Sequence, residues 1–269
     1  MPSARLLSLA LAGATSLAIA TPAAAFASPT STGHRPAVAH AGNPAHSTKP
    51  AHSTKPAHHH GKPSDQLAGP RKGALHALAA STAAVQRIAA SEQASTLLGS
   101  ADKATLAAFD ADARSALSAD VTAAGSATSP QALAALIQAG NRTVQAVKLA
   151  GEVTSAAATG TAAVTGLGAD AAALKAQEAS LPAGTDTSSV EVPLADLTTQ
   201  LSAVQAALST ASTAVLAVPA APSAADLRTA RDATESAMTA AQTALTSAAA
   251  DLAAAQADLA ALTPPAAAA

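Results

Sequence analysis

Residues 194–218 read LADLTTQLSAVQAALSTASTAVLAV, and this stretch carries the clearest indication of the architecture. Its apolar side chains recur at alternating spacings of three and four residues: Leu194, Leu197, Leu201, Val204, Leu208, Ala211, Val215 and Val218. A repeat averaging about 3.5 residues keeps one face of an α-helix apolar and is typical of helices that pack along their length. Pro193 stands where a first-turn proline is tolerated, and Pro219 ends the run. The stretch therefore predicts one long helix with a packed seam.

A second seam follows shortly after the first. Ser223 with Asp226 three residues later resembles a capping box, which starts a helix. Arg231 and Thr234 interrupt the apolar pattern early, so we expect the first two turns of this helix to be less buried. The seam itself is a row of large residues beside a row of mostly alanines: Met238, Leu245, Leu252 and Leu259 beside Ala241, Ala248, Ala255 and Leu262.

The two seams are close neighbours in the chain. Because the connection at 219–222 is short, we expect the seams at 194–218 and 238–262 to pack antiparallel, as in a helical hairpin. An unbroken heptad seam serves association between copies of a chain equally well. A homo-oligomer through the heptad seams is therefore a second expectation.

Upstream of these seams, the pattern predicts helices over 71–98, 102–124, 130–159 and 169–181. Ser129 followed by Pro130 is a typical start for the third of them. Glycines at 160, 166 and 168 cluster where the apolar phase slips, and a mid-helix glycine costs roughly 1 kcal/mol relative to alanine. We therefore predict a break near 160–168. The expected inner stripes of the second and third helices are Leu106, Phe109, Ala113, Leu117 and Val121, then Leu133, Ile137, Val144 and Val147.

Together these patterns predict an all-α fold. We expect an alanine-rich helical bundle with coiled-coil-like seams over 73–262, a disordered arm before it and a disordered tail at 263–269. The segment that begins at Ser129-Pro130 resembles the one at Pro222-Ser223, each with its preceding helix. This similarity favours two three-helix units in series, although alanine-rich helices also align without an internal duplication.

Composition excludes several classes of function. Of 269 residues, 85 are alanine, two are phenylalanine, and none is cysteine, tryptophan or tyrosine. The chain therefore has no disulfide framework, no thiol chemistry and no aromatic platform for stacking nucleic-acid bases. We expect neither a specific nucleic-acid partner nor a small-molecule substrate.

Residues 1–27 have the three parts of a secretory signal peptide. Arg5 supplies the basic start, an apolar run follows, and small residues end it, with cleavage after Ala25 or Ala27 fitting equally well. An uncleaved membrane anchor is the alternative, but Gly13 and Thr15 interrupt a run already near the minimum spanning length of about 17 residues. We therefore expect a secreted protein, loosely associated with the cell wall.

Residues 28–72 form a basic arm rich in proline and histidine. Histidines recur every sixth residue from His34 to His58, and the arm holds six Lys/Arg against one acidic residue. Prolines remove backbone donors and little is apolar, so we expect a disordered spacer. Its positive charge suits an anionic cell-wall polymer or a membrane surface. Imidazole also binds Zn, Cu or Ni, and the weak candidate ligands are His52, His58, His59 and His60.

Few residues of the body offer catalytic chemistry. His76 is its one histidine and is expected to be a half-exposed helical residue. Asp110 and Asp112 lie two residues apart, so a helix points them in different directions. Asp232 and Glu235 share a helix face with Arg228 and Arg231 and are expected to form a solvated ion-pair surface. We predict that the chain is not an enzyme and uses no cofactor.

The sequence thus favours an exported, non-enzymatic helical protein that acts as a spacer or interaction module associated with the cell envelope. A secreted metal-binding protein that uses its histidine-rich arm is the alternative.

Overall fold

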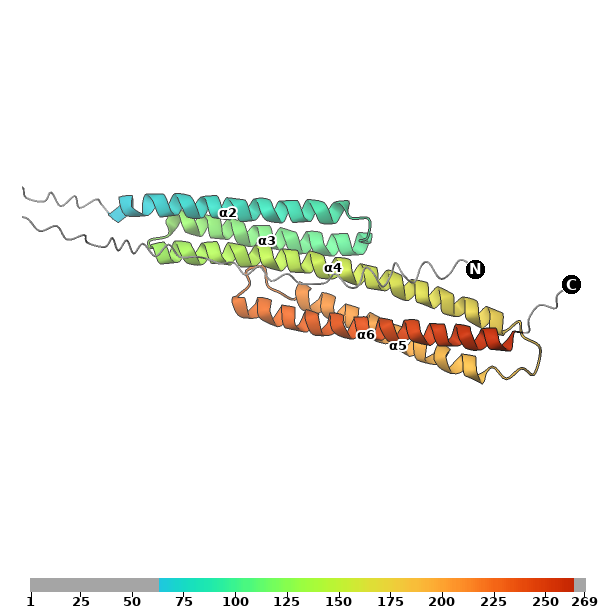
Figure 1. Ribbon diagram of the computed structural model, residues 1–269. Helices are drawn as coiled ribbons and strands as arrows, with labels where there is room; N and C mark the ends of the chain where they lie inside the picture. The colour runs from blue at the N-terminus through green and yellow to red at the C-terminus, as the bar shows by residue number, and fades with distance from the viewer. Residues whose placement is uncertain (1–62, 264–269) are drawn as a thin grey trace, which may run out of the picture. The chain divides into compact units, whose positions relative to one another are not determined.

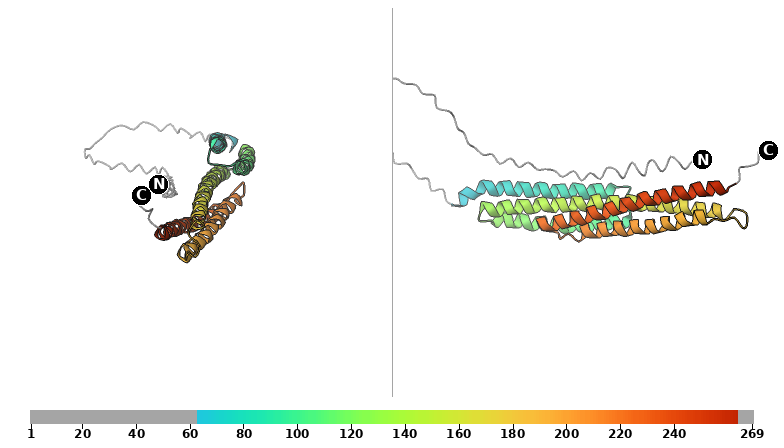
Figure 2. Two further views of the ribbon diagram at one scale, coloured as in Figure 1. Left: turned by 90° about the vertical axis from the view of Figure 1, so that its right-hand side faces the viewer. Right: turned by 60° about the horizontal axis from the view of Figure 1, so that its bottom comes forward.

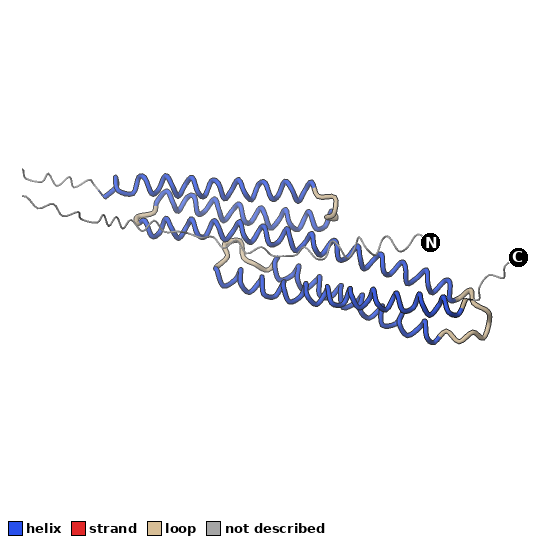
Figure 3. Tube along the Cα trace, viewed as in Figure 1, coloured by secondary structure: helices blue, strands red, loops and turns tan. Residues whose placement is uncertain are grey.

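The computed structural model describes residues 63–263, with side chains from Leu67 onward. The expected signal peptide, the arm as far as residue 62 and the tail from residue 264 lie outside the described residues. Within the described range the chain is all-α, with no strand (Figures 1 and 3). The helices are α2 (Pro63–Ala94), α3 (Ser100–Ser126), α4 (Pro130–Glu178), α5 (Ser188–Leu216) and α6 (Ala224–Leu262).

Capping explains where two of these helices begin. The Oγ of Ser129 accepts a hydrogen bond from the Ala132 N–H at 3.1 Å, and Pro130 follows in the first turn of α4. At α6 the expected capping box is present, because Ser223 Oγ accepts from the Asp226 N–H and Asp226 Oδ2 accepts from the Ser223 N–H. The bonds from Ser223 also lower the pKa of Asp226, since they stabilise its charged form.

The helices form two three-helix units that share α4. In the first unit, α2 and α3 pack on each other and on the first half of α4; in the second, α5 and α6 pack on each other and on its second half. Figure 2 shows α4 between the α2–α3 pair and the α5–α6 pair. A further apolar cluster lies where the units meet, and we call it the junction core: it contains Leu98, Leu106, Leu149, Val153, Val215 and Leu227 among others.

The predicted break near 160–168 is wrong, because α4 runs uninterrupted through 49 residues. The expected helices at 130–159 and 169–181 are parts of this one helix. Gly160 lies against Leu208 of α5, and a Cβ at Gly160 would stand 2.7 Å from Leu208 Cδ1. Gly140 lies in the same way against Leu78 of α2, and a Cβ at Gly140 would stand 2.8 Å from Leu78 Cδ2. These glycines make room for neighbouring side chains, and tertiary packing offsets their low helix propensity.

The boundary between arm and body also differs from the prediction. Helix α2 begins at Pro63, so residues 63–72 are helical rather than part of an irregular arm. Arg71 fixes this first part of α2, because its Nη2 donates a hydrogen bond to the Ala127 carbonyl at 2.8 Å. The start of α2 is therefore tied to the turn that precedes α4.

The antiparallel hairpin of α5 and α6 is confirmed. Early residues of α5 share a core with late residues of α6, as Leu197 does with Leu252, and late α5 residues pack with early α6 residues. One expectation about α6 is wrong, since Leu227 is buried and Thr234 is only 1% exposed. The first turns of α6 are buried because they pack in the junction core. Met238 and Leu245 are only half-buried, whereas Ala241, Ala248 and Ala255 are buried together with Leu252 and Leu259.

Candidate functional site

The structure describes only some of the site residues that were predicted from the sequence. His52, His58, His59 and His60 lie outside the described residues, so their role as metal ligands stays a prediction. His76 is exposed on α2. Within residues 67–263 no group of three or more potential metal ligands comes together. No helix of the described part is long and apolar enough to cross a membrane.

The two expected acidic pairs do not form sites of their own. Asp110 is buried and Asp112 is exposed, so their side chains point apart as predicted. Asp232 and Glu235 are exposed, but the ion pairs expected with the neighbouring arginines are absent from this described part of α6. The salt bridge formed among the described residues joins Lys148 to Glu152 at 3.5 Å on the surface of α4. The acidic face of α6 is therefore solvated without ion pairs.

A buried pair of carboxyl groups is the most unusual site of the body. Glu92, near the end of α2, is 7% exposed, and Asp110, on α3, is 2% exposed. The Glu92 carboxyl contacts Gly151 of α4 and fills the space that a side chain at position 151 would occupy. Three helices therefore enclose this pair, and the missing Cβ of Gly151 makes the space.

The protonation of the pair follows from its surroundings. No backbone group or other side chain among the described residues donates a hydrogen bond to any of the four carboxyl oxygens, so each carboxyl has only the other as a polar neighbour. Burial raises the pKa of Glu92 to about 8, together with the charge of Asp110 and the hydrogen bond that protonated Glu92 donates to Asp110. Burial also raises the pKa of Asp110, although the hydrogen bond from Glu92 and the charge of Arg114 oppose that rise. With Glu92 protonated and Asp110 ionised, the pair holds one negative charge in the core instead of two.

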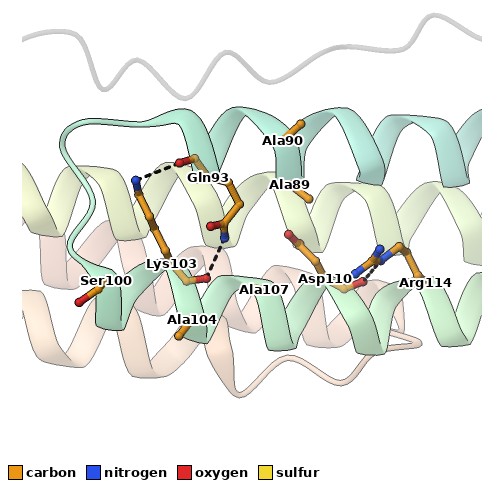
Figure 4. Close-up of a pocket in the computed structure, with 9 residues that line it drawn as sticks. All are labelled: Ala89, Ala90, Gln93, Ser100, Lys103, Ala104, Ala107, Asp110 and Arg114. Carbon is orange, nitrogen blue, oxygen red and sulfur yellow. Dashed lines mark hydrogen bonds between the residues drawn. The ribbon is translucent and has the colours of Figure 1, made fainter.

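A shallow groove of about 510 Å³ lies between α2 and α3 beside this pair (Figure 4). Alanines of both helices line it, together with Gln93, Lys103, Asp110 and Arg114. The side chain of Asp110 points from α3 toward α2. Gln93 Nε2 donates to the Lys103 carbonyl at 3.1 Å, and Lys103 Nζ donates to the Gln93 carbonyl at 2.9 Å. Arg114 Nε donates to the Asp110 carbonyl at 3.2 Å.

Chemically, this arrangement can hold a proton in a nearly water-free position. It has neither a histidine nor an activated hydroxyl beside it in the described body, since the histidine of α2, His76, lies about four turns earlier and is exposed. The groove alongside is open and lined by small residues, so it offers little surface to enclose a substrate. The pair is therefore better suited to affect the stability of the protein than to react with a bound molecule.

Sequence reasoning missed Glu92 and did not place Asp110 in the core. In α3 the predicted inner stripe includes Phe109, yet Phe109 is half-buried and Asp110 takes the buried position between Leu106 and Ala113. Glu92 follows Val85 by seven residues and therefore lies on the buried stripe of α2. An acidic residue at a seam position in each of two paired helices is the signal that points to the site.

No protein-family model, curated protein or solved structure matches this chain. Its function is therefore inferred from its own residues and their geometry.

Proposed function

We propose that the chain is an exported, non-enzymatic helical protein that acts as a spacer or interaction module associated with the cell envelope. The observation that carries the spacer role is the path of the chain through the body. Arg71 ties the start of α2 to Ala127, just before α4 begins. At the other end, Leu259 of α6 packs with Leu174, near the end of α4.

The chain therefore enters the body beside the start of α4 and leaves it beside the end of α4. With a rise of 1.5 Å per residue, the 49 residues of α4 span about 74 Å. Whatever is attached to the two ends of the body is held apart by roughly this length. Separation of two attachment points is what a spacer requires.

The charge distribution supports attachment through the arm. Residues 28–62 hold four Lys/Arg, seven histidines and no acidic residue, whereas all 17 Asp/Glu lie from Asp65 onward. A basic segment next to an acidic body favours contact with an anionic cell-wall polymer or an anionic membrane surface. Lys and Arg near an anionic lipid surface contribute about 1 kcal/mol each, and salt screens exposed charges beyond about 8 Å.

Retention on isolated cell walls tests this proposal. The secreted chain from residue 28 is compared with a chain that starts at Pro63, which leaves α2 intact. A matched control keeps the length of the arm and replaces Arg35, Lys49, Lys55 and Lys62 with glutamine. We expect retention that depends on the arm and its charge, weakens with salt and grows below about pH 6.5, where histidines gain charge. Equal retention of all three chains would overturn the envelope contact.

The metal-binding alternative rests on the six-residue histidine spacing and the cluster of His58, His59 and His60. A zinc titration by calorimetry separates it from the spacer. Stoichiometric binding that disappears in the chain starting at Pro63, and in H58A/H59A/H60A, would favour the metal-binding protein. Light scattering of the intact chain tests the expected homo-oligomer independently.

A further inference from the structure

The core of the first unit contains two acids, whereas the described core of the second unit contains none. Glu92 and Asp110 occupy seam positions in α2 and α3, where the flanking inner residues are Val85, Leu106 and Ala113. A buried ionised carboxylate is strongly unfavourable unless it is paired or neutralised. The pair must therefore keep a proton for this packing to persist.

The described groups around the pair offer no cationic partner within salt-bridge distance. From α3, the exposed Arg114 acts on Asp110 through its charge, while its Nε bonds to the Asp110 carbonyl. From α4, Gly151 contributes no side chain, and the neighbouring Lys148 and Glu152 are exposed and paired with each other. From α2, the adjacent Gln93 bonds to Lys103. Neutralisation of the pair therefore depends on its own proton.

The position of the pair gives that proton a mechanical consequence. Glu92 lies two residues before α2 ends, and the connection to α3 follows immediately. In this connection Leu97 is 64% exposed, whereas Leu98 is 6% exposed and belongs to the junction core. The acidic pair and the apolar contacts of Leu98 hold this end of α2 in place. The other side-chain hydrogen bonds between this end of α2 and α3, among the described residues, are the two exposed ones between Gln93 and Lys103.

We propose that Glu92 and Asp110 form a proton-dependent latch that holds the end of α2, with Leu98, against α3, α4 and the junction core. When the shared proton leaves, two like charges face each other in the core. The end of α2 and the connection at 95–99 then swing away to hydrate them, which exposes part of the junction between the units.

The direction of the pH effect follows from linkage. The pKa of Glu92 in the folded protein, about 8, lies above its ordinary value of 4.5. Between these values the folded chain holds a proton that the unfolded chain has lost, so stability falls as pH rises through this window. The latch is closed on the acidic side and opens above about pH 8.

Thermal unfolding of the full chain, followed by circular dichroism from about pH 5 to about pH 9, tests the latch. E92Q keeps the size of the side chain and a donor but cannot ionise. We expect the Tm of the unmodified chain to fall with rising pH, and E92Q to melt higher at the alkaline end by about 3 °C or more. D110N should likewise flatten the profile, and it carries the test if E92Q fails to fold.

D112N is the matched control, because it removes a carboxyl from the same helix at an exposed position. Its profile should run parallel to that of the unmodified chain. Parallel profiles for the unmodified chain, E92Q and D110N would overturn the proposal. So would a rise in the alkaline Tm on adding millimolar Mg²⁺ or Ca²⁺ that E92Q lacks, because the pair would then be a cation site.

Hydrogen exchange locates the opening. At the same alkaline pH, we expect faster exchange in the unmodified chain than in E92Q across residues 86–99, and no difference across α5. An equal acceleration throughout the body would contradict a local latch.

Discussion

Along α4, the first unit packs Leu78 of α2 against Gly140, and the second packs Leu208 of α5 against Gly160. Both units thus use a glycine of the shared helix to admit a leucine. They differ at Gly151, where the first unit places the carboxyl of Glu92 instead of an apolar side chain. Among the described residues the second unit has no buried carboxyl, and its inner face on α6 is mostly alanine.

This difference separates two ways of using the same heptad pattern. In α5 and α6, small residues bring the helix axes together and leucines fill the remaining space, and no buried side chain of these two helices is titratable. In α2 and α3, two seam positions carry acids, so part of the packing depends on a proton. The two units therefore need not respond alike to mutation or pH.

Truncating a buried leucine in the second unit should destabilise the body most. Leu208 is 4% exposed and packs against Gly160, so L208A should cost about 2–5 kcal/mol of unfolding free energy. Leu245 is half-buried, and L245A should cost clearly less. Chemical denaturation measures both. Equal losses at the two positions would mean that the alanine row does not form the inner face of α6.

Glycine-to-alanine substitutions in α4 should have the next largest effect on the unfolding free energy. They should be destabilising at two sites and stabilising at a third. In G160A and G140A the new methyl group would stand 2.7 or 2.8 Å from a leucine carbon, and overpacking of this kind costs about 1–3 kcal/mol. A Cβ at Gly166 would have no atom within 4 Å, so G166A should gain up to about 1 kcal/mol. Denaturant melts of the three variants give these differences. Stabilisation by G160A would show that the close approach of α5 is not required.

A weaker effect should be seen at the start of α6. The capping box of Ser223 and Asp226 closes the second unit at the junction, and S223A should cost about 1 kcal/mol. The pKa of Asp226 is lowered in the folded protein, so its contribution is present at neutral pH and is lost as pH falls through the acidic range. D226N removes this titrating contribution, so in an acid titration D226N should be less stable than the unmodified chain at neutral pH, and the two should converge at low pH.

The surface ion pair of α4 should matter least. Lys148 and Glu152 are exposed, so E152Q should change the unfolding free energy by less than about 0.5 kcal/mol. The contrast with E92Q isolates burial, because both substitutions replace one glutamate of the first unit with glutamine. A large pH-dependent effect of E152Q on the Tm would weaken the case for the latch.

Much of the fold was accessible from the sequence, for identifiable reasons. The seam at 194–218 repeats without a gap, and a short connection follows it, so the α5–α6 hairpin and its direction were predictable. The continuity of α4 was not. Gly160 favours a helix break by its intrinsic propensity, and only its contact with Leu208 explains why it remains helical.

The candidate site was less accessible because it depends on contacts between helices. In the sequence, Glu92 and Asp110 resemble ordinary surface acids. Each occupies a position of the apolar repeat of its helix, but this is seen only when the repeat is permitted to include polar residues. Thr234 likewise interrupts the apolar pattern, although it is buried in α6. Burial of these polar residues is set by partner helices that no single-helix pattern contains.

The two-unit architecture requires α4 to be one continuous helix, and a distance measured across Gly160 shows whether it is. The chain has no cysteine, so spin labels can be attached at Q138C and K175C, two exposed positions on either side of that glycine. Pulsed electron resonance should give a narrow distribution near about 55 Å, and Q138C with T159C should give about 32 Å. A broad distribution, or one centred well below about 55 Å for the long pair with the short pair unchanged, would contradict a continuous α4.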